Sequence, residues 1–162
     1  MVERGLAKSR SQAQSLIMAG RVYLDNSKLE KPGSQVGRDV AIEVRGKEYP
    51  WVSRGGLKLD HGLNHFCIDM LGATCLDIGA STGGFTDVLL ARGATSVYAV
   101  DVGHGQLDWK LRQDERVIVL EKTNARYLTS GAIPTPISFL CCDVSFISLM
   151  VVLPNSMAMV SE

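Results

Sequence analysis

Apolar and polar positions along the 162-residue chain follow one pattern up to about residue 46 and another after it. In the first part, Ser9-Arg10-Ser11-Gln12 has the form of a capping box, and Ala13, Leu16 and Ile17 follow at helical spacing before Gly20. Alternating segments at 21–24 and 39–45 are separated by turn-forming residues. With Val2–Lys8 interpreted as the end of another helix, the pattern predicts two short helices packed on a small antiparallel sheet.

From residue 57 onward, short apolar runs alternate with helical segments. Helices are predicted at 57–66, 85–92, 106–112 and 144–152, and strands at 74–78, 96–101, 117–120 and 137–142. This alternation is typical of a parallel sheet with crossover helices. The fold class expected is therefore α/β, a Rossmann-like domain preceded by a small α+β domain. We expect domains at 1–47 and 57–162, joined by a linker at 48–56 in which Ser53-Arg54-Gly55-Gly56 has no regular structure.

The stretch from Asp77 to Asp87 has the order strand, glycine loop, helix, which is typical of nucleotide-cofactor folds. Its spacing is not the G-x-G-x-x-G of dinucleotide-binding proteins. An unpaired carboxylate at Asp77 would repel a pyrophosphate, whereas S-adenosylmethionine carries a cationic centre and an ammonium group and no phosphate. The contrast favours S-adenosylmethionine as the cofactor, with an ordinary tight turn of an α/β protein as the alternative.

Polar residues or glycine follow four of the predicted strands, where ligands of such sheets bind. Asp101 occupies the position at which an acid holds a ribose diol. The expected cofactor-binding residues are Asp77, Gly79, Ala80, Ser81, Gly83, Gly84, Phe85, Asp101, Val102, Asn124 and Asp143. Lys58 falls in the first turn of a predicted helix, where a cation opposes the helix dipole. It is either an ordinary exposed lysine or a functional one.

Composition narrows the class of protein. Apolar residues make up 46% of the chain and charged residues 21%, which are globular values. No apolar run approaches the roughly 18 residues of a membrane span, and the first residues do not resemble a secretory signal. The four cysteines have no C-x-x-C spacing, so we expect no metal site, no disulfide framework and a reducing, cytoplasmic location.

Charge is unevenly distributed although the net charge is zero. Residues 1–60 contain 11 Lys/Arg and 7 Asp/Glu, whereas residues 61–162 contain 6 and 10. The basic first part, in which Lys8, Arg10 and Arg21 gather around a helix N-terminus, predicts an anionic partner. A chance offset of charge is the alternative.

Two resemblances carry these inferences further. Residues 5–13, 16–17 and 20–25 are similar to the RNA-binding module of ribosomal small-subunit protein four and of pseudouridine synthases. The whole chain resembles the hemolysin A (TlyA) family, an RNA-binding module followed by an FtsJ-like methyltransferase domain. The segments that match are 51–59, 77–87, 98–103, 106–112 and 143–148.

The resemblance implies transfer of a methyl group from S-adenosylmethionine to a ribose 2′-hydroxyl of ribosomal RNA. It implies RNA-binding roles for Lys8, Ser9, Arg10, Arg21 and Arg54, and catalytic roles for Lys58 and Asp143 as two members of a Lys-Asp-Lys-Glu tetrad. No lysine follows Lys122, so the second lysine is missing from the sequence. We therefore expect a fragment, short of about the last third of the methyltransferase domain and of the first few residues, with little activity alone.

The sequence fits three alternative functions less well. An RNA-binding protein with a non-catalytic second half is the main alternative, and absence of S-adenosylmethionine binding would favour it. A pore-forming hemolysin is disfavoured by the lack of a spanning segment, a basic amphipathic helix and a secretion signal. A dehydrogenase is disfavoured by the missing G-x-G-x-x-G and by Asp77.

Overall fold

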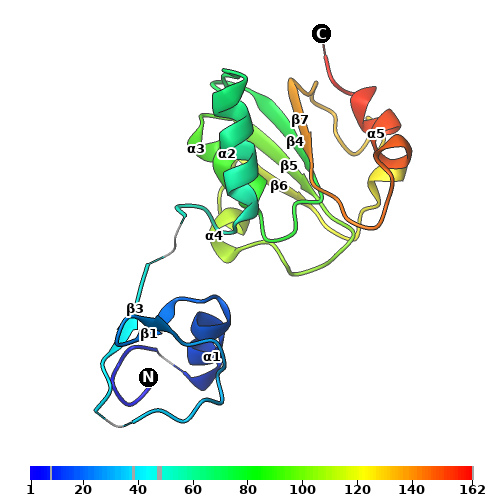
Figure 1. Ribbon diagram of the computed structural model, residues 1–162. Helices are drawn as coiled ribbons and strands as arrows, with labels where there is room; N and C mark the ends of the chain where they lie inside the picture. Colours follow the sequence, from blue (N-terminus) through cyan, green and yellow to red (C-terminus); the bar gives the residue numbers. More distant parts are fainter. Residues whose placement is uncertain (8, 38, 47–48, 162) are drawn as a thin grey trace. The chain divides into compact units, whose positions relative to one another are not determined.

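The computed structural model describes residues 1–7, 9–37, 39–46 and 49–161. It divides into two compact units, Met1–Pro50 and Trp51–Glu162 (Figure 1).

The first unit consists of helix α1 (Arg10–Met18) and a three-stranded antiparallel sheet in the order β2-β1-β3. The strands are β1 (Val22–Leu24), β2 (Ser27–Lys28) and β3 (Ile42–Val44). The predicted helix cap is confirmed, since Ser9 Oγ accepts a hydrogen bond from Gln12 N at 3.1 Å. Asp25 and Asn26 both have positive φ, as the two central residues of a tight hairpin require.

The expected first helix at Val2–Lys8 is wrong for the residues that the structure describes there. Met1 O accepts hydrogen bonds from Arg4 N and Leu6 N, and Gly5 has φ +68°. A left-handed residue at this point closes a turn and prevents a helix from continuing. Lys8 lies outside the described residues.

The second unit is an α/β domain with a four-stranded parallel sheet in the order β6-β5-β4-β7. Its strands are β4 (Thr74–Ile78), β5 (Ser96–Val100), β6 (Val117–Leu120) and β7 (Phe139–Cys142). The helices are α2 (Gly55–His65), α3 (Gly84–Ala91), α4 (Trp109–Arg112), the 3-10 helix η1 (Ala125–Tyr127) and α5 (Leu149–Met157). The predicted parallel sheet is confirmed.

Two hydrophobic clusters cover the two faces of this sheet. Side chains of successive strand residues point to opposite faces, so Cys75 and Val97 pack with Leu63 of α2 and Leu89 of α3. Leu76, Ile78, Tyr98 and Val100 pack on the other side with Ala125, Leu128, Ile137 and Val152. Figure 1 shows α2 and α3 on one face of the sheet and α5 on the other.

Helix α2 begins at Gly55, so the prediction that Gly55 and Gly56 lie in an irregular linker is wrong. A Cβ at Gly56 would lie 2.6 Å from the Trp51 ring. A Cβ at Gly84, the first residue of α3, would lie 2.9 Å from Gly56 N. Gly56 thus leaves room for the Trp51 ring, and Gly84 lets the first turn of α3 approach the backbone of α2 closely. These contacts outweigh the poor helix propensity of glycine.

Two other helix boundaries differ from those predicted. Helix α4 begins at Trp109 rather than at Gln106, because Asp108 caps it by accepting from Lys110 N at 2.9 Å. Helix α5 begins at Leu149 rather than at Val144, because Phe146 has φ +65° and Ser148 caps the helix. Residues 144–148 therefore form a loop after β7.

Candidate active site

The loop between β4 and α3 has an unusual backbone. Gly79, Ser81 and Gly83 all have positive φ, at +82°, +49° and +94°. Glycine adopts this region without strain, whereas serine does so at a cost of about 1 kcal/mol or more. Gly79 N and Ala80 N both donate to Val100 O, at 2.9 and 3.1 Å, which binds the loop to the end of β5.

Gly79 also packs against the chain that leaves β7. A Cβ at this position would lie 2.8 Å from the carbonyl oxygen of Asp143 and 2.9 Å from Val144 Cγ1. Both distances are too short for a side chain without a shift of the backbone. The missing side chain therefore allows Asp143 to lie beside the glycine loop.

Asp77 is almost completely buried, with 1% of its surface exposed. Its Oδ2 accepts hydrogen bonds from Thr86 N at 3.0 Å and from Thr86 Oγ1 at 2.7 Å. Its Oδ1 is buried and finds no hydrogen-bond partner among the described residues. Burial raises the pKa of Asp77 to about 6, Thr86 opposes this rise, and the charges of Asp143 and Asp101 add to it. Asp77 thus ties β4 to the start of α3.

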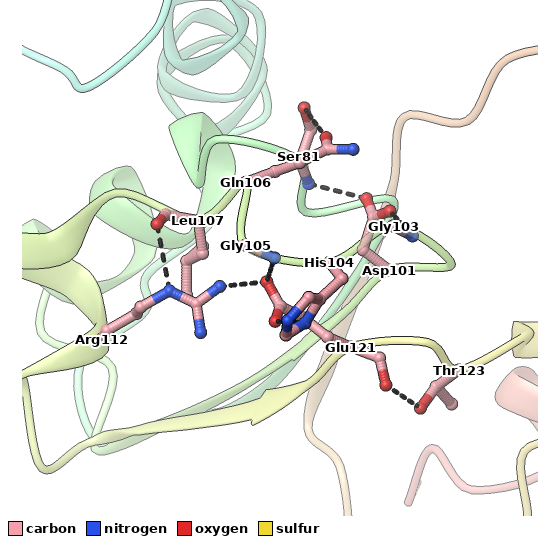
Figure 2. Close-up of polar contacts among 10 residues, drawn as sticks. All are labelled: Ser81, Asp101, Gly103, His104, Gly105, Gln106, Leu107, Arg112, Glu121 and Thr123. Carbon is pink, nitrogen blue, oxygen red and sulfur yellow. Dashed lines mark hydrogen bonds and ion pairs between the residues drawn. The ribbon is translucent and has the colours of Figure 1, made fainter.

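Asp101, at the end of β5, binds two loops through its carboxylate. Its Oδ2 accepts from Ser81 N at 2.8 Å and its Oδ1 accepts from Gly103 N at 2.7 Å (Figure 2). Gln106 lies on the same side, and its Oε1 accepts from Ser81 Oγ at 3.3 Å. Each carboxylate oxygen can accept more than one hydrogen bond, so Asp101 retains capacity for a ligand hydroxyl.

A cavity of about 590 Å³ opens at the carboxyl ends of the strands, within the size range of small-molecule sites. It contains two carboxylates and, among its described lining residues, no lysine or arginine. Its lining comprises Ile78, Gly79, Ser81, Val100, Asp101, Val102, Gln106, Thr123, Asn124, Ala125, Asp143, Val144, Ser145, Phe146, Ile147 and Val152. Six of the residues predicted to bind a cofactor are thus brought together: Gly79, Ser81, Asp101, Val102, Asn124 and Asp143.

A second, smaller cavity of about 290 Å³ adjoins the first and shares Gly79, Ser81, Asp143 and Ser145 with it. Lys58 of α2 lies in this smaller cavity. Its Nζ lies 2.9 and 3.1 Å from the two carboxylate oxygens of Asp143, and both side chains are substantially exposed. The two residues predicted to be catalytic therefore contact each other at the border of the two cavities.

The remaining predicted cofactor residues are distributed differently. Ala80, Gly84 and Phe85 line the smaller cavity, whereas Asp77 and Gly83 line neither. A Cβ at Gly83 would overlap the side chains of Leu107 and Leu111. Gly83 thus allows α3 to pack against the segment around α4.

Several lining residues lie outside the predicted set. Gln106 and Thr123 contribute polar groups to the larger cavity, and Phe146 is fully exposed beside it with φ +65°. The sequence gives little indication of Phe146, because positive φ is rare for an aromatic residue. Gln106 could have been suspected from its place in the loop that follows Asp101.

The residues predicted to bind RNA belong to different parts of the chain. In the first unit, Ser9 caps α1 and Arg10 is exposed in its first turn. Arg21 Nε donates to Arg45 O at 3.1 Å, and the Arg45 guanidinium lies 3.9 Å above the Tyr23 ring. Arg54 is exposed and precedes α2 in the second unit, and Lys8 lies outside the described residues.

The α/β sheet, the glycine loop and the acid after β5 define the class of a Rossmann-like cofactor-binding domain. Residues 51–161 match the FtsJ-like methyltransferase family and residues 1–42 match the S4 domain. The chain belongs to the FtsJ-like methyltransferase family and carries an S4 domain in front of it. This confirms the resemblances found in the sequence.

The relatives share both parts of the chain. The chain is 54% identical, over 95% of its length, to "16S/23S rRNA (cytidine-2'-O)-methyltransferase TlyA" of Mycobacterium tuberculosis, and covers 58% of that protein. It is 44% identical over 93% of its length to "Hemolysin A" of Brachyspira hyodysenteriae, and covers 62% of it. A solved structure, "Putative hemolysin from Streptococcus thermophilus", is 43% identical with a TM-score of 0.73, over 99% of this chain and 59% of that one.

The chain spans less than two thirds of the length of these relatives. Two of them are named hemolysins. The helices formed by the described residues are all too short or too polar to cross a membrane.

Proposed function

We propose that the protein binds S-adenosylmethionine in the larger cavity and transfers its methyl group to a ribose 2′-hydroxyl of ribosomal RNA. The observation that carries the proposal is the contact between Lys58 and Asp143 at the border of the two cavities. It joins a candidate acceptor site to a candidate cofactor site in a chain of the FtsJ-like methyltransferase family. The name of the Mycobacterium tuberculosis relative, a 16S/23S rRNA (cytidine-2'-O)-methyltransferase, supports the acceptor.

The residues of the larger cavity suit S-adenosylmethionine. Asp101 can accept hydrogen bonds from the ribose hydroxyls, and Val102, 69% exposed, and Ala125 offer apolar surface to the adenine. The two carboxylates suit a ligand that carries a sulfonium and an ammonium group. A dinucleotide would bring a pyrophosphate to a lining with no described cation, so the same electrostatics disfavour it.

When bound, S-adenosylmethionine would supply an electrophilic methyl group. Lys58 is suited to orient the 2′-oxygen in the smaller cavity by donating a hydrogen bond to it, which favours in-line attack. Asp143 holds the Lys58 ammonium through both carboxylate oxygens, which lie 2.9 and 3.1 Å from Nζ. As the oxygen attacks, its proton must leave. The Asp143 carboxylate is the group of this pair that can accept the proton, directly or through water, since the Lys58 ammonium has no free lone pair.

Ribosomal RNA is the substrate class that the first unit supports. It is an S4 domain, and residues 1–50 contain 9 Lys/Arg and 6 Asp/Glu, an excess of three basic charges. Arg10 stands at the N-terminus of α1, where the side-chain charge and the helix dipole both favour phosphate. We infer that the S4 domain holds the RNA whose ribose is methylated.

Calorimetric titration with S-adenosylhomocysteine, S-adenosylmethionine and NAD tests the cofactor. We expect the first two to bind and NAD not to bind. Asp101→Ala should weaken binding by about tenfold or more, since hydrogen bonds to a charged group are lost. Asp114→Ala is the matched control, because Asp114 lines neither cavity.

Incubation with ribosomal RNA and methyl-labelled S-adenosylmethionine tests the acceptor. If the RNA takes up label and its backbone becomes resistant to alkaline cleavage at one position, the methyl group is on a ribose 2′-oxygen. RNA binding without any S-adenosylmethionine binding would overturn the proposal and favour a non-catalytic RNA-binding protein. Label on a base would overturn the acceptor alone.

A further inference from the structure

One wall of the larger cavity is a loop, residues 102–107, between β5 and α4. Val102 and Gln106 of this loop line the cavity. The loop has no regular secondary structure, and Gly105 has φ +69°. A wall of this kind needs an external support if it is to keep its shape before a ligand binds.

Glu121, directly after β6, contacts this loop through its carboxylate (Figure 2). Its Oε1 accepts from Gly105 N at 2.9 Å, and its Oε2 lies 2.9 Å from His104 Nδ1. Its Oε1 also accepts from Arg112 Nη2. Arg112 Nε in turn donates to Leu107 O at 3.2 Å. The Glu121 carboxylate therefore contacts His104 and Gly105 in the middle of the loop directly. Arg112 links the same carboxylate to Leu107 at the end of the loop.

The burial and the charges of Glu121 and Arg112 favour stable contacts with the loop. The side chain of Glu121 is 12% exposed and that of Arg112 is 23% exposed. The Gly105 N–H holds the pKa of Glu121 down, to about 2, with help from Arg112 and His104 against the effect of burial. Glu121 is thus ionised at neutral pH, and hydrogen bonds to an ionised group in a largely buried place are the strong ones.

Backbone hydrogen bonds also join the segment after β6 to the chain that leaves β5. Lys122 N donates to Gly103 O and Thr123 N donates to Asp101 O, both at 2.9 Å. At the other end, the Gln106 side chain accepts from Ser81 Oγ in the glycine loop. The loop is therefore fixed between the end of β6 and the glycine loop, and Glu121 is its central charged contact. Glu121 itself does not line the cavity.

We propose that Glu121 is a positioning residue for the cofactor site: it holds the 102–107 loop so that Val102 and Gln106 keep the shape of the cavity wall. The inference rests on the proposed function, because the cofactor is the ligand whose affinity it concerns. It extends that function by assigning a role to an acid that does not contact the ligand.

The experiment compares Glu121→Ala and Glu121→Gln with the unaltered 162-residue chain. Glutamine keeps an oxygen that can accept from Gly105 N but loses the charge that binds Arg112, so its effect should be the smaller one. Asp114→Ala is the matched control, since it also removes an acid paired with an arginine, Arg116 at 2.7 Å, but at a place that lines neither cavity.

Two quantities are measured. Hydrogen exchange of residues 103–107 in the free protein reports on the loop, and we expect faster exchange at the Gly105 amide in Glu121→Ala. Titration with S-adenosylhomocysteine should show an affinity about tenfold lower or more, as expected for a lost charge-assisted hydrogen bond. Asp114→Ala should leave both quantities unchanged. If Glu121→Ala does not fold, a smaller loss of affinity with faster exchange in Glu121→Gln is the supporting result.

Faster loop exchange with an affinity within twofold of the unaltered chain would overturn the inference. So would an equal loss of affinity in Asp114→Ala, because the effect would then be general destabilisation. If the unaltered chain binds no S-adenosylhomocysteine, the proposed function fails and this inference with it. Binding by the unaltered chain with unchanged affinity in both Glu121 variants overturns this inference alone.

Discussion

Asp77 is a buried carboxyl group whose ionisation should make the stability of the second unit depend on pH. Burial raises its pKa from the ordinary 3.8 to about 6. One pKa unit corresponds to about 1.4 kcal/mol, so the raised pKa is worth about 3 kcal/mol of folding free energy. The sign follows from the raised value: the contribution is fully present below about pH 3.8 and is lost as the pH rises through about 6. Asp77→Asn removes the ionisation and keeps an oxygen that can accept from Thr86.

Urea unfolding followed by tryptophan fluorescence measures this effect. Trp51 and Trp109 are the two tryptophans of the chain, and both belong to the unit Trp51–Glu162, so the signal reports on that unit. Between about pH 4 and pH 7, the difference in unfolding free energy between Asp77→Asn and the unaltered chain should shift by about 3 kcal/mol in favour of the variant.

Thr86→Val provides a second variant with the opposite effect on the same group. It removes the hydroxyl donor that opposes the rise of the Asp77 pKa, so the loss of stability with rising pH should continue to a higher pH and be larger in total. Curves for Asp77→Asn and the unaltered chain that stay parallel across this range would refute the reasoning, because Asp77 would then titrate at its ordinary pKa.

Three other predictions concern the loop, the lysine and the S4 domain. Gly79→Ala should lower the unfolding free energy by roughly 2 kcal/mol or more in urea unfolding, because of φ +82° and the contact with Asp143 O, whereas Gly62→Ala, in an open helical position, should be neutral or stabilising. In a form of the protein that includes the second lysine implied by the family resemblance, Lys58→Met should reduce the rate of methyl transfer by about a hundredfold with almost unchanged affinity for S-adenosylhomocysteine; an unchanged rate would remove Lys58 from the mechanism. Arg10→Ala should lower the slope of RNA affinity against salt concentration by about one if Arg10 contacts a phosphate; a slope that stays the same would exclude that contact.

The hydrophobic pattern was enough to predict the parallel sheet, because each of its strands is a short apolar run between helical segments. The pattern failed where tertiary contacts determine the start of a helix. Gly55 and Gly56 have poor helix propensity and yet begin α2. At Gly56 a side chain would overlap the Trp51 ring, a contact that the hydrophobic pattern does not reveal. The loop before α5 was missed because an apolar segment at 144–152 gives no sign that Phe146 takes a positive φ.

The candidate site was predictable where residues act through their position at a strand end. Asp101, Asn124 and Asp143 follow β5, β6 and β7 and line one cavity, as the topology requires. The roles of Asp77 and Gly83 were not predictable from the sequence. Asp77 is buried and bonded to Thr86, and Gly83 gives room to Leu111, and both contacts depend on how the chain packs. Glu121 was not predicted at all, since its partners come from a loop without a hydrophobic pattern.

The strand order has a consequence for folding during synthesis. Among the described strands β4 is central, and its neighbour β7 is made after β4, β5 and β6. Until residues 139–142 leave the ribosome, β4 has an open edge rich in apolar residues, of the kind that invites pairing with other chains. Pairing β4 with β7 also closes the longest loop of the sheet, which makes this step slow compared with the pairing of β4 with β5. A nascent chain stalled before residue 139 should therefore be more prone to aggregation, and more dependent on chaperones, than one that already contains residues 139–142.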